Sequence, residues 1–408
     1  MPTADPLLLV ADHVAGRVSV FDVPDGTELA TLTGRHVSEH AGFLHLPRGR
    51  VAFVDDLGGA LVVLDTAAAR TGGALEEAVI PVATPAEHLA SDVTGQRLAV
   101  TTGLGPHETP WSDLLTVVDL PGAQSTRVRS RVGEPGVTLV ARRDGDAAVV
   151  LRHREPGAFA VHGHTDLLRA GPGCPRVTAE AGLPLPADAH GDAHDPRHGR
   201  VFTASGEGVH RARLDARGLT AEEPLPWGAE GRGWFLRFDT THRRLWSCLR
   251  GGPADPAHWP EWTNTAWCHS VDSGRTAHVE LGPGLAFRMA LSRTSAAFTR
   301  VHPDGDELIL VSRGAQRPRV TARVPLPAMS GAPRRGGTPW DGVQRRAVAA
   351  SPGADVVAVS RGGHGEVHLF DGVDGHRTGT LRLPTPLDEG GRLAVVQDGS
   401  TGHDTVGH

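Results

Sequence analysis

Short runs of β-branched and other apolar residues alternate with polar residues along almost the whole chain, and Gly, Asp and Pro interrupt them. Alternation with a period of two, bounded by turn residues, is typical of β-strands joined by hairpins. Apolar residues at helical spacing over three turns are almost absent. The pattern therefore predicts an all-β protein.

One phrase recurs along the chain: an apolar strand ends in Asp, and a short turn with Gly follows. Examples are Val20-Phe21-Asp22 before Gly26 and Leu369-Phe370-Asp371 before Gly375. A repeat of about 45 to 50 residues with four short strands is typical of a β-propeller blade. We predict eight blades, with seven as the alternative. The predicted blades span residues 5–33, 39–83, 86–131, 134–170, 186–226, 231–282, 285–327 and 343–384.

The two ends of the repeat complement each other. The first unit lacks an innermost strand, whereas 391–398 has the pattern of an innermost strand without its blade. We expect the N- and C-terminal strands to share one blade, because this closure removes the open edge of a sheet. The prediction is a single propeller domain over 1–398, followed by a flexible C-terminal tail, 399–408.

Composition narrows the possible functions. A net charge of −6 argues against a nucleic-acid partner. The chain has no Lys and no Tyr, which excludes a lysine Schiff base and a tyrosine general acid. No apolar run is long enough to span a membrane, and the first residues lack the pattern of a secretory signal. We expect a cytoplasmic protein, or a periplasmic or extracellular one only if the sequence is a processed form.

Histidine is unusually frequent, with 23 residues, and its placement suggests a metal site. In a propeller the innermost strands surround one channel, so residues at their starts become neighbours. Three predicted starts carry His, and imidazoles with nearby carboxylates suit zinc or a similar divalent ion. The predicted metal ligands are His88, His190, His40 and Asp192. The alternative, equally weighted for each residue, is a half-exposed imidazole that bonds a carbonyl.

Other histidines form clusters along the chain, and we interpret most of them as surface imidazoles. Their members are His36, His45, His162, His164, His194 and His198.

The other half of the predicted ring supplies guanidinium groups. Arg232, Arg288 and Arg345 are candidate ligands for a small anion, since guanidinium forks match carboxylate and phosphate. The alternative is that Arg, as the chain's only cation, is simply expected at loop ends.

A Trp-rich insertion, 251–266, includes Trp259 and Trp262, which we predict to form a partner or ligand surface. A thick, well-packed blade is the equally weighted alternative. Cys248 and Cys268 fall on neighbouring predicted strands; free core thiols are the default, and whether they pair is open. The chain has neither a GxSxG nucleophile motif nor a phosphate-binding Gly loop.

Several stretches resemble zinc-metallochaperone propellers, which accompany bacterial zinc ABC transporters. They are Leu8-Leu9-Val10-Ala11-Asp12-His13, Pro85-Ala86-Glu87-His88, Cys174-Pro175, Ala189-His190-Gly191-Asp192-Ala193 and Gly206-Glu207-Gly208-Val209. The resemblance implies that His88 and His190 belong to a metal site, whereas His40 rests on blade equivalence alone.

The chain also departs from that family. The family is exported, whereas the first residues of this sequence lack the pattern of a secretory signal. The family also has an acquisition loop rich in His and Asp, and the nearest counterpart in this sequence is 188–198. A weaker likeness, over 233–274, is to amine dehydrogenase heavy chains, which are scaffolds for a light chain that carries the cofactor.

Three functions remain open at this level. The first is a propeller that holds or transfers zinc, with a metal-acceptor protein as partner. The second is a cytoplasmic metal-assisted enzyme acting on a small anionic substrate in the channel. The third is a non-catalytic scaffold or heavy-chain-like subunit.

Overall fold

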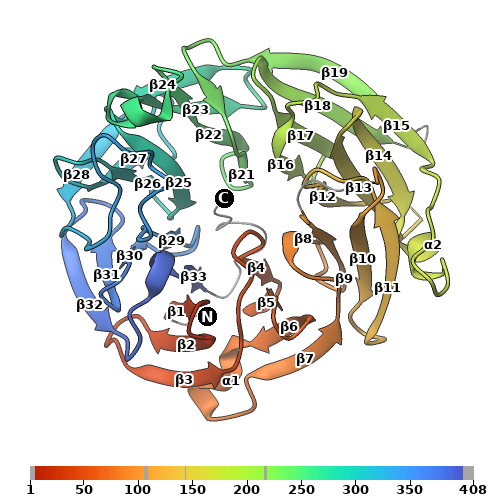
Figure 1. Ribbon diagram of the computed structural model, residues 1–408, viewed down its shortest axis with the longest axis horizontal. Helices are drawn as coiled ribbons and strands as arrows, with labels where there is room; N and C mark the ends of the chain where they lie inside the picture. The colour runs from red at the N-terminus through yellow and green to blue at the C-terminus, as the bar shows by residue number, and fades with distance from the viewer. Residues whose placement is uncertain (1–4, 105–108, 143, 216–217, 398–408) are drawn as a thin grey trace.

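The strands form a ring of eight antiparallel sheets around a central axis (Figure 1). The computed structural model describes residues 5–104, 109–142, 144–215 and 218–397; the predicted tail, 399–408, lies outside them. The prediction of an eight-bladed β-propeller is confirmed, and the alternative of seven blades is wrong.

Each blade is a meander that runs from the channel to the rim. In the first four blades the strands, from the innermost outward, are β33 (Arg392–Val396), β1 (Leu7–Asp12), β2 (Arg17–Asp22) and β3 (Glu28–Thr33); β4 (Phe43–Leu46), β5 (Arg50–Asp55), β6 (Ala60–Asp65) and β7 (Glu76–Pro81); β8 (Ala86–Ser91), β9 (Arg97–Thr102), β10 (Asp113–Asp119) and β11 (Gln124–Ser130); and β12 (Gly136–Ala141), β13 (Ala147–Arg154), β14 (Gly157–Gly163) and β15 (Ala181–Pro184).

The last four blades follow the same order, and in the sixth the innermost strand is split into two short pieces. Their strands are β16 (His190–Asp195), β17 (Arg200–Ala204), β18 (Gly208–Asp215) and β19 (Gly218–Pro226); β20 (Arg232–Gly233) with β21 (Arg237–Asp239), β22 (Arg244–Gly251), β23 (Thr263–Ser270) and β24 (Thr276–Glu280); β25 (Leu285–Leu291), β26 (Ser295–Val301), β27 (Glu307–Ser312) and β28 (Val320–Pro325); and β29 (Val348–Ala350), β30 (Val356–Arg361), β31 (Glu366–Asp371) and β32 (Arg377–Arg382).

Helical structure is confined to short connections in the part of the chain that the structure describes. These helices are α1 (Thr66–Thr71), α2 (His164–Leu168), η1 (Pro256–Glu261) and η2 (Asp388–Gly390). None of them has the length and apolar character that a membrane span requires.

Burial decreases from the channel to the rim and explains the sequence pattern. Every residue of β1 is buried, whereas exposed and half-buried residues alternate along β28. The inner strands lie between two neighbouring blades, so both of their faces need apolar residues, and an outermost strand presents one face to water.

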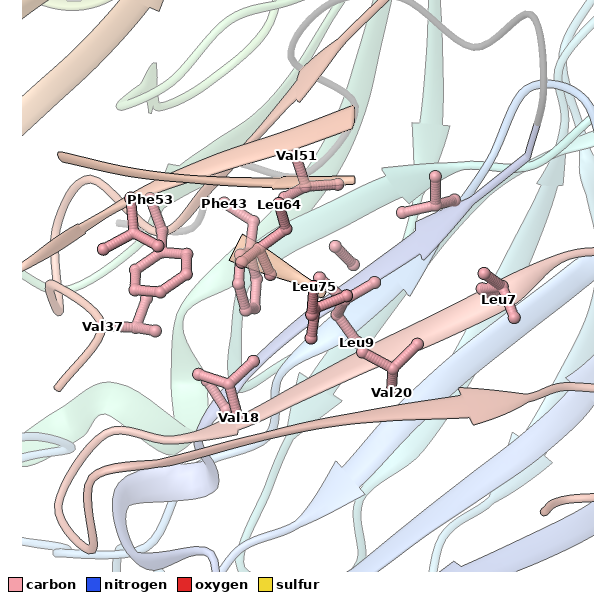
Figure 2. Close-up of a cluster of buried hydrophobic side chains, with 14 of the residues drawn as sticks. Leu7, Leu9, Val18, Val20, Val37, Phe43, Val51, Phe53, Leu64 and Leu75 are labelled. Atoms are coloured by element: carbon pink, nitrogen blue, oxygen red, sulfur yellow. The ribbon is translucent and has the colours of Figure 1, made fainter. Parts of the chain in front are cut away.

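The ring closes within the first blade. β33 pairs antiparallel with β1, and Ala394 lies opposite Leu9. The neighbouring interface, between the first and second blades, is an apolar cluster in which Leu9, Val18 and Val20 approach Phe43 and Leu64 (Figure 2). Pairing of β33 with β1 within one sheet therefore joins the two ends of the chain, and packing against the second blade covers this sheet.

The recurring Asp–Gly phrase forms the turn between the two outer strands. The backbone N–H of Gly26 donates to the carbonyl of Asp22 at 2.9 Å, and Gly375 makes the same bond to Asp371. Both glycines have positive φ, 72° and 79°, a conformation that other residues adopt only at a cost. Backbone geometry at this turn thus explains why a glycine recurs at the same place in the repeat.

Candidate metal site in the channel

A cavity of about 150 Å³ lies among the innermost strands of five blades, β4, β8, β12, β16 and β21. Figure 1 shows these strands side by side around one half of the channel. Three imidazoles line the cavity, from His45 on β4, His88 on β8 and His194 on β16. The ring thus brings together side chains that are far apart in sequence, as the propeller prediction requires.

His45 is the most deeply buried of these three side chains. It lies between Leu44 and Leu46 and is 1% exposed. Neither Nδ1 nor Nε2 has a hydrogen-bond partner among the described residues. Burial lowers the pKa of His45 to about 4, so the imidazole is neutral near pH 7. A neutral imidazole without a partner is costly to bury and is ready to bind a ligand in the cavity.

His194 lies on β16, across the cavity from β4 and β8. Burial lowers its pKa to about 4, with a small opposing effect of Asp195. His45 and His194 are therefore channel residues, and the prediction that they are surface imidazoles is wrong. His162 and His164, 7% and 1% exposed, also contradict it.

Of the predicted metal ligands, His88 lies in the cavity wall and His40 lies beside it. Next to His88, Glu87 also lines the cavity, and its Oε1 is 3.3 Å from His40 Nδ1. This contact with Glu87 raises the pKa of His40, although burial opposes the shift. The His40 side chain remains half exposed. The Glu87 carboxylate thus holds His40 beside the cavity.

His190 begins β16 outside the cavity wall and is held in one orientation. Its Nδ1 lies 2.8 Å from the carbonyl oxygen of Trp234, to which it donates a hydrogen bond. The proton on Nδ1 leaves the lone pair on Nε2, which lies 3.9 Å from Glu134 Oε2. Burial, reinforced by Arg152, lowers the pKa of His190 to about 4. A carbonyl that orients an imidazole in this way is common around metal-binding histidines.

Asp192 lines the cavity, but a guanidinium group already engages it. Arg152 Nε lies 2.9 and 3.1 Å from the two carboxylate oxygens of Asp192, and both side chains are almost fully buried. Breaking such a pair leaves an uncompensated charge. In the structure Asp192 is therefore the counter-ion of Arg152.

The donor atoms in the channel are spread over the cavity. Among the described residues, three donor side chains come within 4.8 Å of one another only at Asp371, Asp374 and His376, an exposed turn of the eighth blade. A metal ion in the channel therefore requires the imidazoles to move toward it.

The three arginines predicted to bind an anion do not form one group. Arg232 stacks on Trp234, with its guanidinium carbon 4.0 Å from the ring centre, and its Nη1 bonds Asp188 at 3.0 Å. Arg288 on β25 and the residue Arg345, which precedes β29, lie in the other half of the ring. Arg232 thus belongs to the imidazole half of the channel.

The prediction that Trp259 and Trp262 form an exposed surface is wrong. They are 0% and 6% exposed and pack with Leu285 and Val301 of the next blade. The insertion folds over as η1 and covers apolar area, which matches the alternative of a thick blade. Cys248 and Cys268 are free and buried; Cys248 lies opposite Ala266, and Cys268 lies opposite Trp246.

Comparisons with known proteins agree with the fold. No protein-family model matches the chain. No curated protein matches it in sequence. Two solved structures of AztD from Citrobacter koseri, one of the apo protein, have TM-scores of 0.64 and 0.65 at 13% identity. They cover 99% and 97% of this chain, and it covers 100% and 98% of theirs.

A solved structure of the dihydro-heme d1 dehydrogenase NirN is also similar, with a TM-score of 0.58 at 14% identity over 92% of this chain and 73% of NirN. The AztD structures share the propeller fold that the sequence resemblance implies. At these identities the likeness establishes the fold alone.

Proposed function

We propose that this propeller binds a divalent metal ion, zinc by preference, in the cavity of its channel and holds it for transfer to an acceptor protein. One observation carries the proposal: His45, His88 and His194 line one cavity from three different blades, and neither buried ring nitrogen of His45 has a partner in the part of the chain that the structure describes. The similarity to AztD structures supports the same assignment.

The chemistry of these donors suits zinc. Zinc binds imidazole nitrogens at about 2.0 to 2.1 Å and accepts three of them, which leaves a fourth position open. The open position is where a ligand from an acceptor protein would attack. Because the donors are dispersed, part of the binding free energy is spent on drawing them together, which favours release.

The other predicted ligands have secondary roles in this proposal. His40 and His190 lie beside the cavity and remain candidate ligands for an ion that enters or leaves. Asp192 stays with Arg152, whose guanidinium group neutralises its charge.

Zinc competition with a chromophoric chelator tests the proposal on metal-stripped protein. We expect one tight site per chain, weakened about tenfold or more in His45→Leu and in His88→Ala, a loss at least as large as that caused by removing a supporting group around a metal. His376→Ala is the control, because it removes the exposed donor cluster on the eighth blade.

Affinity that stays unchanged in both channel variants, or falls only in His376→Ala, contradicts the channel site. His190→Ala distinguishes the two sets of candidate ligands. A larger loss there than in His45→Leu would place the ion with His190 rather than in the cavity.

A further inference from the structure

The guanidinium group of Arg250 is held between two tryptophan rings at the end of β22 in the sixth blade. Its central carbon lies 5.0 Å from the centre of the Trp234 ring and 4.6 Å from the centre of the Trp262 ring. Trp262 is buried, and Trp234 and Arg250 are half buried. Cation–π contacts fix the orientation of a guanidinium group without using its N–H donors, so these donors remain available.

Arg250 has no acid of its own in the part of the chain that the structure describes. No carboxylate and no carbonyl there accepts a hydrogen bond from it. Glu230, the acid that approaches the end of the same strand, accepts the backbone N–H of Gly252 at 3.1 Å instead. Burial and the positive charge of Arg232 lower the pKa of Arg250, and the opposing effect comes from the Cys248 thiol. The side chain is thus a fixed cation whose charge and donors are directed at something outside these residues.

Trp340 forms the exposed side of the same cluster. It lies on the connection between β28 and β29, and its ring centre is 6.4 Å from that of Trp262 and 5.9 Å from the guanidinium carbon of Arg250. It is 47% exposed and is the only aromatic residue among the large apolar residues that are exposed in the described chain. Arginine and tryptophan are enriched at the centres of protein interfaces, where a few such residues supply most of the binding free energy.

We propose that Arg250, Trp262 and Trp340 form a docking surface for a partner protein that presents an acidic side chain beside an apolar one. The partner's carboxylate accepts paired N–H bonds from Arg250, and its apolar side chain covers the Trp340 ring. Because the tryptophan rings already hold the guanidinium group in place, little side-chain entropy is lost when the partner binds.

The position of this surface places a docked partner beside the channel. The carbonyl of Trp234 accepts the hydrogen bond from His190 Nδ1, and the two rings lie 5.9 Å apart. Trp234 in turn contacts Arg250. The docking surface therefore adjoins His190, but it does not depend on metal binding.

Titration of the full chain with two short peptides tests the proposal. One peptide consists of Leu, Phe and Glu, is capped at both ends and carries its charge only on Glu; the other has Gln in place of each Glu. We expect the acidic peptide to bind saturably and at least tenfold more tightly than its Gln counterpart. Arg250→Gln should weaken the acidic peptide about tenfold and leave the Gln peptide unchanged, because only the charge-assisted pair of bonds is lost.

Two further variants separate the contributions of charge and apolar contact. Arg250→Lys keeps the charge without the planar fork and is expected to lie between the wild type and Arg250→Gln. Trp340→Ala, at an exposed position that the fold tolerates, should weaken both peptides alike. It keeps the test valid if Arg250→Gln fails to fold.

Arg176→Gln is the matched control. Arg176 is exposed and stacks on a different tryptophan, Trp111, with its guanidinium carbon 5.2 Å from the ring centre. The proposal is overturned if neither peptide binds saturably at millimolar concentration, if the two peptides bind equally, or if Arg176→Gln weakens binding as much as Arg250→Gln. His45→Leu distinguishes this surface from the metal site, because it is expected to weaken zinc binding and leave peptide binding unchanged.

Discussion

At the residue scale, neutral buried imidazoles make the stability of the fold depend on pH. His153 on β13 is 7% exposed, and its Nδ1 has no partner among the described residues. Burial lowers its pKa to about 4, and the neighbouring Arg131, His162 and Arg152 add to the effect. The folded protein therefore excludes a proton that the unfolded chain binds below about pH 6.5.

Acidification is expected to destabilise the fold through this residue. Because the pKa of His153 is lower in the folded state, its contribution is complete above pH 6.5 and is lost as the pH falls toward 4. At pH 5 one such group costs about 2 kcal/mol. Chemical unfolding at pH 7 and pH 5 measures how far the free energy of unfolding falls on acidification. This fall should be about 2 kcal/mol smaller in His153→Leu than in the wild type.

His376→Leu is the control for this experiment. His376 is exposed, and Asp374 raises its pKa, so its contribution has the opposite sign. An equal acid-induced loss in His153→Leu and the wild type would contradict the role of His153.

At the element scale, β16 shows how one glycine places a candidate ligand. Gly191 has φ 76° and sits at a register shift between His190 and Asp192. A Cβ there would lie 2.6 Å from the carbonyl oxygen of Trp234. That carbonyl orients His190, so the missing side chain permits the contact.

Gly191→Ala is expected to destabilise the protein more than a glycine substitution with equal backbone strain. Gly59 has φ 64° and no atom within 4 Å of a built Cβ, so Gly59→Ala reports the strain alone, about 1 kcal/mol. The clash in Gly191→Ala should add about 2 kcal/mol, the usual cost of overpacking. Thermal melting of both variants measures the difference, and equal melting temperatures would show that the close approach is unimportant.

At the scale of the whole molecule, stability depends on closure of the ring by β33. Val395 is fully buried on this strand, opposite Leu8, in the cluster that joins the eighth blade to the first. Without β33, β1 would present an open edge, which promotes association between chains.

Val395→Asp is expected to lower the free energy of unfolding by about 4 kcal/mol or more and to produce oligomers, since it buries an unpaired charge at the closure. Val79→Asp, on the outermost strand β7 at a position 47% exposed, should change it by less than about 1 kcal/mol. Urea unfolding and size-exclusion chromatography give both readouts. If the Val395→Asp protein is monomeric and unfolds at the same urea concentration as the Val79→Asp protein, closure of the ring is unimportant for stability.

The fold was predictable because it rests on short-range patterns. The Asp–Gly turns, the all-buried inner strands and the unpaired strand near 391–398 are each visible within a few residues. The candidate site was less predictable. Its cavity includes His88 and Asp192 from the predicted set, but also His45 and His194, whose signal was only their place inside innermost strands.

The sequence by itself determined the blades and their closure, because strand period and turn chemistry are local properties of the chain, and the structure decided for eight blades over seven. Only the tertiary structure decided which side chains share the channel. The Arg152–Asp192 pair, the burial of Trp259 and the contact of Arg250 with Trp340 each join residues that lie on different blades or their connections. Such contacts depend on how the sheets pack around the axis. The spacing of residues within one blade therefore does not predict which side chains of another blade they contact.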